Sequence, residues 1–391
     1  MAKLNRPLKI VVAGYAVGFP MGGQIWMMLH YVLGLRRLGH DVLFLEDTSD
    51  WSYPFHPEHG YGGLDSSFGR GILQSVFSHY GLSGRWAYNS VLENKLYGMT
   101  QEELDQFCAE ADLLLNVSGV NPLRENYLRC RVKAVIDTDP VFTQMKIAED
   151  EQTRSYYTAH DACFTWGYNL PSGKPGVPLS GIAWRPTLPP VILEEWIPLD
   201  VAGVGYTTIG SWDTKGRDII FQGQPLSWRK SVKYQAIIDM PRRLPGVALE
   251  LTFSGMHDDA PRYASHGWVV RDALVVSRDP WGYRDYIRNS RGEFTVAKDQ
   301  NVRLKSGWFS DRSACYLAAG RPVITEDTGF GSYLPTGEGL FAFENMEQAI
   351  QIVKTLEADP SRHRHAARSI AAEYFDAKKV LSRLLRELDL A

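Results

Sequence analysis

Four consecutive residues, Ser310 to Ser313, have the types and the spacing that bind an anion at the start of a helix. Ser310 is a favourable N-cap residue, and Asp311 suits a first helical turn. The backbone N–H groups of Asp311, Arg312 and Ser313 would lie beside two hydroxyl groups, where the helix dipole favours negative charge. The pattern therefore predicts a binding site for a diphosphate.

A polar loop made of Glu326, Asp327, Thr328 and Gly329 lies a short distance along the chain from this helix. Gly320 stands where a left-handed residue would end the helix, and Pro322 begins a short apolar strand that leads into the loop. A helix that runs antiparallel to this strand places its N-terminus at the edge where parallel sheets bind ligands. We therefore expect the loop to complete the site, with Glu326 and Asp327 holding sugar hydroxyl groups. The alternative is an ordinary capped helix followed by a polar loop.

Two further polar residues follow predicted strands in the same half of the chain. Ser211 comes after a strand over residues 206–209, and Lys298 follows a strand over residues 292–297. By the same rule, both side chains should face the ligand edge of the sheet. A lysine there can neutralise a diphosphate, although a solvated surface lysine is the alternative.

A carboxylate pair, Asp137 and Asp139, follows a predicted strand over residues 133–137 in the first half of the chain. Such a pair can bind a divalent metal, form a turn before Pro140, or act as a base on an acceptor hydroxyl. The pair lies far along the sequence from the helix start at Ser310. We therefore predict a catalytic role and no metal site, with a simple turn as the alternative.

Two loops of the first half contain further candidate contacts. Gly22 and Gly23 end a glycine-rich loop after a strand over residues 8–13. They would let the backbone approach a ligand, and a tight turn is the alternative. His56 and His59 lie in a long loop of a kind that is often functional. We expect them to contact an acceptor, the alternative being solvated histidines.

The composition is that of a globular chain of 391 residues with a net charge of -3. That charge indicates no general basic surface for nucleic acid. The cysteines have no metal-type spacing and lie in apolar segments, so we expect free buried thiols in a reducing compartment. They are Cys108, Cys130, Cys163 and Cys315. The sequence has no apolar run of membrane-spanning length, and we expect a cytoplasmic protein.

Predicted strands and helices alternate along the chain in two rounds. The first round begins at residue 8, and strands begin again at Tyr206, after a proline-rich connector over residues 186–198. This alternation is typical of parallel α/β sheets with crossover helices. We predict a Rossmann-like domain over residues 1–198, a second Rossmann-like domain over residues 199–375 and a final helix over residues 376–391.

Three short patterns resemble glycosyltransferases of the GT-B class, which have two Rossmann-like domains facing a cleft. They are LRRLGHDV from Leu35 to Val42, AAGRPV from Ala318 to Val323, and DTG from Asp327 to Gly329. The resemblance implies a nucleotide-sugar such as a UDP-sugar, bound as a co-substrate with no further cofactor. It also implies a final helix that crosses back onto the first domain. The chain departs from many retaining members at Gly307 and Cys315, where those enzymes have two glutamates.

The leading prediction is metal-independent sugar transfer from a nucleotide-sugar to a small-molecule or glycan acceptor. The predicted donor-binding residues are Gly22, Gly23, Ser211, Lys298, residues 310–313 and residues 326–329, and the predicted acceptor contacts are His56 and His59. The carboxylates of the first domain would activate the acceptor. A nucleotide-sugar epimerase of the same fold is one alternative. A catalytically silent scaffold is another, which the missing glutamates support.

Overall fold

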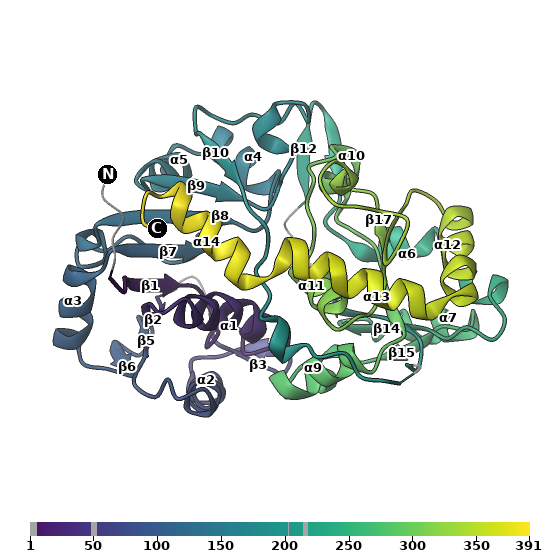
Figure 1. Ribbon diagram of the computed structural model, residues 1–391, viewed down its shortest axis with the longest axis horizontal. Coiled ribbons are helices and arrows are strands. Elements are labelled where there is room, and N and C mark those ends of the chain that lie inside the picture. Colours follow the sequence, from purple (N-terminus) through teal and green to yellow (C-terminus); the bar gives the residue numbers. More distant parts are fainter. Residues whose placement is uncertain (1–5, 48–52, 202, 214–217) are drawn as a thin grey trace.

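The computed structural model describes residues 6–47, 53–201, 203–213 and 218–391, and Figure 1 shows two α/β units side by side. One unit is built on an eight-stranded sheet and the other on a six-stranded sheet. The expected α/β class with two Rossmann-like units is therefore confirmed. The two sheets divide the chain between Pro186 and Tyr206.

The first sheet has the strand order β10-β9-β8-β7-β1-β2-β5-β6, and only the last pair is antiparallel. Its strands are β1 (Lys9–Ala13), β2 (Asp41–Glu46), β5 (Trp86–Ser90), β6 (Lys95–Tyr97), β7 (Leu113–Val117), β8 (Val132–Asp137), β9 (Ala162–Thr165) and β10 (Trp184–Pro186). Its helices are α1 (Gly22–Arg37), α2 (Ser67–His79), α3 (Gln101–Glu110), α4 (Phe142–Glu149) and α5 (Glu151–Thr158). Strands β3 (Phe55–His56) and β4 (Tyr61–Gly62) form a separate hairpin.

The second sheet is entirely parallel, with the order β15-β14-β11-β16-β17-β18. Its strands are β11 (Tyr206–Ser211), β14 (Leu249–Ser254), β15 (Val269–Arg271), β16 (Gly292–Thr295), β17 (Val323–Glu326) and β18 (Leu340–Phe343). Its helices are α6 (Lys230–Gln235), α7 (Ala260–Ser265), α8 (Ala273–Val276), α9 (Pro280–Arg288), α10 (Asp299–Arg303), α11 (Asp311–Ala318), α12 (Met346–Ala358) and α13 (Pro360–Ile370). Strands β12 (Ile219–Phe221) and β13 (Gln224–Leu226) form a hairpin before α6.

Shorter helical turns complete the described chain. The 3-10 turns are η1 (Tyr127–Arg129), η2 (Leu170–Ser172), η3 (Leu193–Glu195), η4 (Met240–Arg243) and η5 (Phe330–Ser332), and η6 (Ala371–Phe375) is a π-helical turn. In both sheets the chain changes direction beside the first strand, because β1 lies between β7 and β2 and β11 lies between β14 and β16. Open parallel sheets bind ligands at the carboxyl ends of their strands beside such a reversal.

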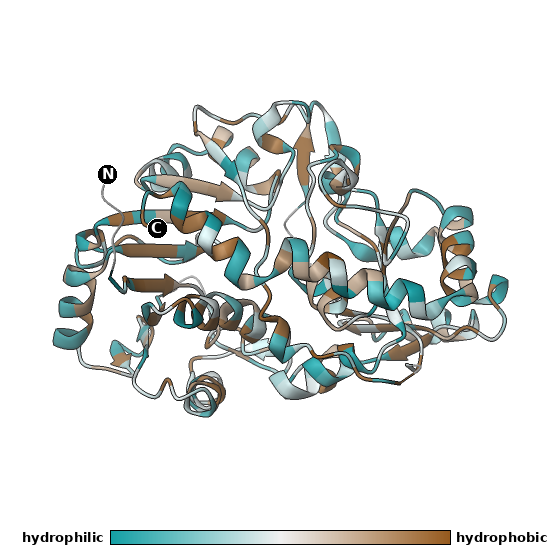
Figure 2. Cartoon of the chain, viewed as in Figure 1, coloured by the Kyte–Doolittle hydropathy of each residue, from teal (hydrophilic) through white to brown (hydrophobic). Residues whose placement is uncertain are grey.

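The strands form the apolar interior, as Figure 2 shows by their brown colour. Strand β7 is buried along its whole length, as a parallel sheet covered by helices on both faces requires. Helix α3 begins with a capping box, in which the side chains of Thr100 and Glu103 each accept the other's backbone N–H. Gly320 has a φ of +65° and ends α11 as predicted. All four cysteines are free and buried, as expected.

Residues 227–240 do not form one continuous helix. Helix α6 covers only Lys230–Gln235, and the 3-10 turn η4 follows at Met240–Arg243. Pro241 lies within this turn, where a missing N–H interrupts an α-helix. Strands β5 and β6 were not among the predicted elements, because short strands of mixed polarity lack a continuous apolar run.

The last helix, α14 (Ala377–Glu387), packs on the first unit. In Figure 1 the yellow C-terminal helices run from the second unit across to α1. Leu381 is fully buried there, and an added Cβ on Gly34 of α1 would lie 2.5 Å from Leu381 Cδ1. The Val191 N–H also donates to the Phe375 carbonyl at 2.7 Å. The segment between the sheets and the C-terminus are thus joined to each other and to α1.

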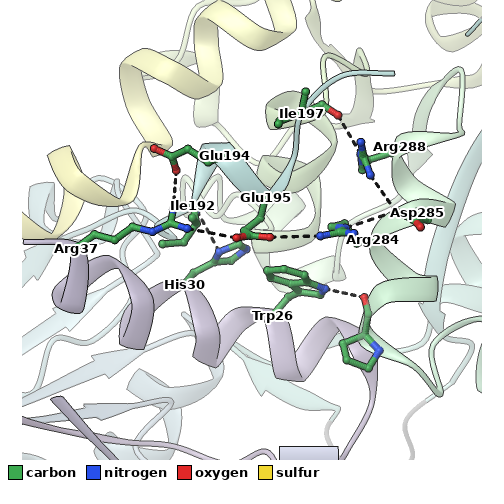
Figure 3. Close-up of polar contacts among 11 residues, drawn as sticks. Trp26, His30, Arg37, Ile192, Glu194, Glu195, Ile197, Arg284, Asp285 and Arg288 are labelled. Atoms are coloured by element: carbon green, nitrogen blue, oxygen red, sulfur yellow. Dashed lines mark hydrogen bonds and ion pairs between the residues drawn. The ribbon is translucent and has the colours of Figure 1, made fainter. Parts of the chain in front are cut away.

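A network of charged and aromatic side chains joins α1, the connecting segment and α9 (Figure 3). Glu195 of the connecting segment accepts from Arg37 of α1 at 3.2 Å and from Arg284 of α9 at 3.3 Å. The Trp26 indole N–H donates to the Pro280 carbonyl at 2.7 Å. The two units therefore touch directly on this side as well as through the chain that connects them.

The buried histidine of this network has a defined tautomer. His30 Nδ1 accepts the Ile192 backbone N–H at 3.1 Å, so the ring proton is on Nε2, which lies 3.5 Å from Cys315 Sγ of α11. Burial, together with the charge of Arg37, lowers the pKa of His30 to about 3. His30 therefore stays neutral and connects α1 with α11.

In the described part of the chain, no helix is both long enough and apolar enough to span a bilayer.

Truncating Leu381 should show how much the α1–α14 contact stabilises the protein. Leu381→Ala removes a buried side chain, and we expect the free energy of unfolding in urea to fall by about 2–5 kcal/mol. Lys378→Ala changes an exposed position of the same helix and should stay within about 0.5 kcal/mol of the unsubstituted protein. Equal stability of both variants would contradict the packing described here.

Candidate functional site

A large cavity of about 1160 Å³ lies between the two units, at the carboxyl ends of their central strands. The first unit contributes residues that follow β1, β7 and β8, and the second contributes residues that follow β11, β16 and the start of α11. These are the two places where the strand order reverses, so each sheet presents its ligand edge to the other. The cavity is the candidate active site.

Three cationic side chains of the second unit line this cavity: Lys230, Lys298 and Arg312. Gly210 near the end of β11 makes room for Lys230, since a Cβ there would lie 2.9 Å from Lys230 Nζ, and Arg312 Nη1 would lie 3.6 Å from the same Cβ. Burial, then the charges of Arg312 and Lys298, lower the pKa of Lys230 to about 7. The three cations therefore act on one another across a small volume.

Three hydrogen-bond acceptors fix the orientation of the Arg312 guanidinium. Its Nε donates to Glu293 Oε1 at 2.6 Å, its Nη1 to the Ile209 carbonyl at 2.9 Å and its Nη2 to Thr295 Oγ1 at 3.0 Å. Glu293 is fully buried, so it both compensates the guanidinium charge and fixes its orientation.

Lys230 differs from Arg312 in its surroundings. No hydrogen bond or ion pair reaches its Nζ from the described residues, and its closest aromatic contact is the face of Phe253, 5.1 Å away. An ammonium group has three N–H donors, and an anion in the cavity would satisfy them.

Lys298 links the two units across the cavity. Its Nζ lies 2.5 Å from Asp139 Oδ1 of the first unit and 3.5 Å from the centre of the Trp228 ring. Trp228 in turn packs edge to face on Phe142 of α4, with ring centres 4.9 Å apart. The predicted residues Lys298 and Asp139 are thus brought together, and they close one side of the cavity.

Asp137 lines the cavity, but groups of its own unit donate hydrogen bonds to its carboxylate. It accepts hydrogen bonds from Thr143 Oγ1 at 2.7 Å, Thr165 Oγ1 at 2.8 Å and Gln144 Nε2 at 2.9 Å, as well as from the Asp139 backbone N–H. Burial raises the pKa of Asp137 despite these bonds. The geometry gives Asp137 the role of holding the turn that carries Asp139.

The start of α11 reaches the cavity as the sequence predicts. Ser310, Asp311 and Arg312 line it, whereas Ser313 is buried behind them. Ser310 occupies the N-cap position, but its side chain makes no capping bond and instead lies 3.4 Å from Asp311 Oδ1. The N–H groups of this first turn are therefore not capped by the residue expected to do so.

The acidic loop after β17 lies outside the residues that line the cavity. Glu326 accepts the Ala297 N–H at 2.9 Å and lies 3.3 Å from Lys233 Nζ, and Asp327 pairs with Lys305 at 2.7 Å. These bonds give both carboxylates structural partners. Their contact with a sugar stays a prediction.

The two other residues of that loop also make contacts within the protein. Thr328 is buried and donates from Oγ1 to the Trp308 carbonyl at 2.5 Å. The Gly329 carbonyl accepts from Asn169 Nδ2 of the first unit at 3.1 Å, and a Cβ on Gly329 would lie 2.9 Å from that same nitrogen. The loop is thus part of a contact between the two units.

The glycines at the start of α1 make room for a protein side chain. A Cβ on Gly22 would lie 2.4 Å from Tyr283 Cβ, and one on Gly23 would lie 3.2 Å from Tyr283 Oη. Gly23 and Tyr283 line the cavity, and Gly22 does not. The group that lies against these glycines is thus a tyrosine of the second unit, and their contact with a ligand stays a prediction.

His56 and His59 lie on the β3–β4 hairpin, with stacked rings whose centres are 4.3 Å apart. Neither lines the cavity, although their neighbour Phe55 does. Ser211, at the end of β11, lines the cavity as predicted from its place after the strand. The acceptor role of the two histidines stays a prediction.

A buried carboxylate shapes the loop after β1. Glu46 Oε2 accepts the backbone N–H groups of Ala16 and Val17 at 2.6 and 2.7 Å, and Oε1 accepts that of Gly18 at 2.7 Å. Burial raises the pKa of Glu46 to about 7, against the opposite effect of these three bonds. The glycine-rich loop beside the cavity is therefore folded around one side chain.

Lys230 is the main site residue that was not predicted from the sequence. It begins α6, the first helix after β11, and helices that follow strands of a parallel sheet start at the ligand edge. That rule could have found it, but a hairpin stands between β11 and α6 and hides the strand–helix connection.

Solved structures with the same architecture are glycosyltransferases. HepE from Anabaena, in complex with UDP and glucose, is 11% identical with a TM-score of 0.56, covering 98% of this chain and 100% of that one. Sucrose-phosphate synthase from Thermosynechococcus elongatus is 12% identical with a TM-score of 0.53, covering 97% and 98%. An alpha-glucosyltransferase in complex with UDP and a 13-mer DNA is 12% identical with a TM-score of 0.58, covering 97% and 98%.

These likenesses confirm that the chain has the GT-B fold over nearly its whole length. No protein-family model matches the sequence, and no curated protein matches it by sequence.

Replacing Glu46 should loosen the loop after β1. In Glu46→Gln one amide N–H would face a backbone N–H, so at pH 8 we expect the free energy of unfolding to fall by about 1–3 kcal/mol. Glu110→Gln changes an exposed carboxylate and should alter it by less than about 0.5 kcal/mol. If the Glu46 variant is as stable as the Glu110 variant, the three hydrogen bonds do not hold the loop.

Proposed function

We propose that the protein is a glycosyltransferase that moves a sugar from a UDP-sugar to an acceptor bound in the cavity between the two units. The observation that carries this proposal is the Lys230 ammonium group, which faces the cavity beside Lys298 and Arg312 and makes no ion pair with any residue that the structure describes. Clustered cations suit the two charges of a diphosphate. The fold shared with glycosyltransferases solved with UDP supports the choice of nucleotide.

Lys230, Lys298 and Arg312, which together we call the clamp, would act on the leaving group of the reaction. Cleavage of the bond between sugar and phosphate leaves negative charge on the diphosphate, and preorganised cations stabilise that charge. Arg312 is already oriented by Glu293, so little reorganisation is needed when the donor binds. The first turn of α11, where the Ser310 side chain makes no capping bond, adds backbone N–H groups on the same side.

Asp139 is the carboxylate of the first unit that we assign to the acceptor. In the structure Lys298 Nζ lies 2.5 Å from Asp139 Oδ1. Donor binding would draw Lys298 toward the diphosphate and away from Asp139. The Asp139 carboxylate would then accept a proton from an acceptor hydroxyl. Asp137 would support it by fixing the turn, as its four hydrogen bonds indicate.

The acceptor would lie against the first unit. Its wall of the cavity is rich in aromatic and aliphatic side chains, which include Tyr15, Phe19, Met27, Phe55 and Tyr156. Such surfaces suit the apolar faces of sugars or of other flat rings. We propose a small-molecule or glycan acceptor, with the charge neutralisation supplied by lysine and arginine in place of a metal.

A direct assay separates this proposal from its alternatives. The protein is incubated with a panel of UDP-sugars, and UDP release is measured with and without candidate acceptors, each in the presence and absence of EDTA. Transfer predicts acceptor-dependent UDP release that EDTA leaves unchanged. An epimerase would interconvert sugars without acceptor, and a silent scaffold would do neither. Loss of activity with EDTA, restored by Mg²⁺ or Mn²⁺, would instead indicate that Asp137 and Asp139 are metal ligands.

UDP affinity should depend on pH through Lys230. Its pKa of about 7 means that the free protein loses this charge as the pH rises above 7, while a bound diphosphate favours the protonated form. Calorimetry should therefore show affinity that is highest below pH 7 and falls from pH 7 to 9, by at most about tenfold per pH unit. Lys230→Arg keeps its charge throughout and should show a flatter profile. The same slope in both proteins would exclude Lys230 from the clamp.

A further inference from the structure

The β3–β4 hairpin has two different faces. Its strands pair so that Phe55 lies opposite Gly62, and His56 lies opposite Tyr61. Opposite residues of an antiparallel pair share a face, whereas neighbours along one strand point to opposite faces. Phe55 and Gly62 therefore lie on one face of the hairpin, and His56 and Tyr61 lie on the other.

The face of Phe55 belongs to the cavity. Phe55, Gly62 and Tyr53 all line it, and Tyr53 lies against Gly62, where an added Cβ would be 2.8 Å from Tyr53 Cβ. Phe55 packs on Phe19, another residue of the cavity, with ring centres 5.1 Å apart. The Phe55 backbone N–H donates to the Gly18 carbonyl at 2.9 Å, so the hairpin is fixed to the loop after β1.

The face of His56 makes its contacts away from the cavity. His56 packs on Phe68 of α2, with ring centres 4.7 Å apart, and it stacks on His59. His59 in turn stacks on Tyr61, with ring centres 5.6 Å apart. These four residues are not among those that line the cavity. This face therefore joins the hairpin to α2 and leaves the opposite face to the cavity.

Tyr53 is 56% exposed, although it lines the cavity. A ligand on this ring would contact the protein on one side and water on the other, so it needs apolar and polar groups together. A sugar ring has both, because the C–H groups of one face can pack on the aromatic ring while the hydroxyl groups stay hydrated. A lipid chain would leave apolar surface in water at this position.

The hairpin and the carboxylate that we assign to the acceptor lie at different strand ends. Asp139 follows β8, whereas the hairpin is bonded to the loop after β1, and β7 lies between these two strands. Two strand spacings amount to about 10 Å. One sugar ring is narrower than this separation, so an acceptor that reaches both places contains at least two sugars.

We propose that Tyr53 forms an outer subsite for a glycan acceptor of two or more sugars. The sugar with the reacting hydroxyl group would lie at Asp139, and a sugar further along the glycan would stack on Tyr53. This inference rests on the proposed function and narrows its acceptor to a glycan. Gly62 is part of the subsite, because any side chain there would displace Tyr53.

The test uses the two exposed tyrosines of the hairpin as a matched pair. Tyr53 and Tyr61 are 56% and 65% exposed, and of the two Tyr53 lines the cavity. With UDP in excess, the protein is applied to an array of immobilised glycans that range from single sugars to oligosaccharides. The affinity for the oligosaccharide that binds most tightly is then measured by calorimetry.

Tyr53→Ala should weaken binding of this oligosaccharide by about twofold to tenfold, the range for the loss of one aromatic contact. Tyr53→Phe keeps the ring, and Tyr61→Ala changes the other face, so both should bind it like the unsubstituted protein. UDP affinity should be the same in all four proteins. For the single sugar at the reacting end, Tyr53→Ala and the unsubstituted protein should give equal signals, because that sugar does not reach the hairpin.

The outcomes separate this inference from the proposed function. If the unsubstituted protein binds UDP but no oligosaccharide, or if Tyr53→Ala and Tyr61→Ala lose equal affinity, the subsite is refuted and the proposed function stands. The subsite is also refuted if the protein floats with vesicles of phosphatidylcholine and phosphatidylglycerol and both alanine variants lose flotation without a change in glycan binding. If the unsubstituted protein binds neither UDP nor any UDP-sugar, the proposed function fails together with this inference.

Discussion

The concentration of positive charge at the ends of β11 and β16 is the constraint on which the rest of the site depends. Lys230, Lys298 and Arg312 raise one another's electrostatic energy, and Arg312 is held by a fully buried counter-ion, Glu293. A folded protein keeps like charges together at a cost in stability, and such groups are typical of sites that bind an anion. Gly210 preserves the arrangement, because any side chain there would displace Lys230.

The same charges also connect the two units. Lys298 reaches Asp139 across the cavity, while Glu195 holds Arg37 and Arg284 on the side of the connecting segment (Figure 3). The first contact would compete with a diphosphate, and the second would not. Donor binding could therefore weaken the Lys298–Asp139 contact without disturbing the contacts of Glu195. The connecting segment would then keep the two sheet edges aligned while ligands bind and leave the cavity.

Much of the fold and part of the site could be predicted from the sequence, because continuous apolar runs identify buried parallel strands and residues after them lie at one edge. That rule predicts Ser211, Lys298 and Asp139 at the ligand edge, and all three line the cavity. The rule also placed Asp327 at that edge, but Asp327 does not line the cavity, because the loop after β17 contacts Asn169 of the other unit. The rule could not find Lys230, because a hairpin separates β11 from α6 along the chain.

A crystal structure of the protein with UDP tests the central claim most directly. The account predicts a diphosphate between β11 and the start of α11, with its oxygens within hydrogen-bonding distance of Lys230 Nζ and the Arg312 guanidinium, and with Lys298 turned from Asp139 toward the phosphate. A diphosphate bound elsewhere, or one in the cavity that leaves Lys230 without a contact, would contradict it.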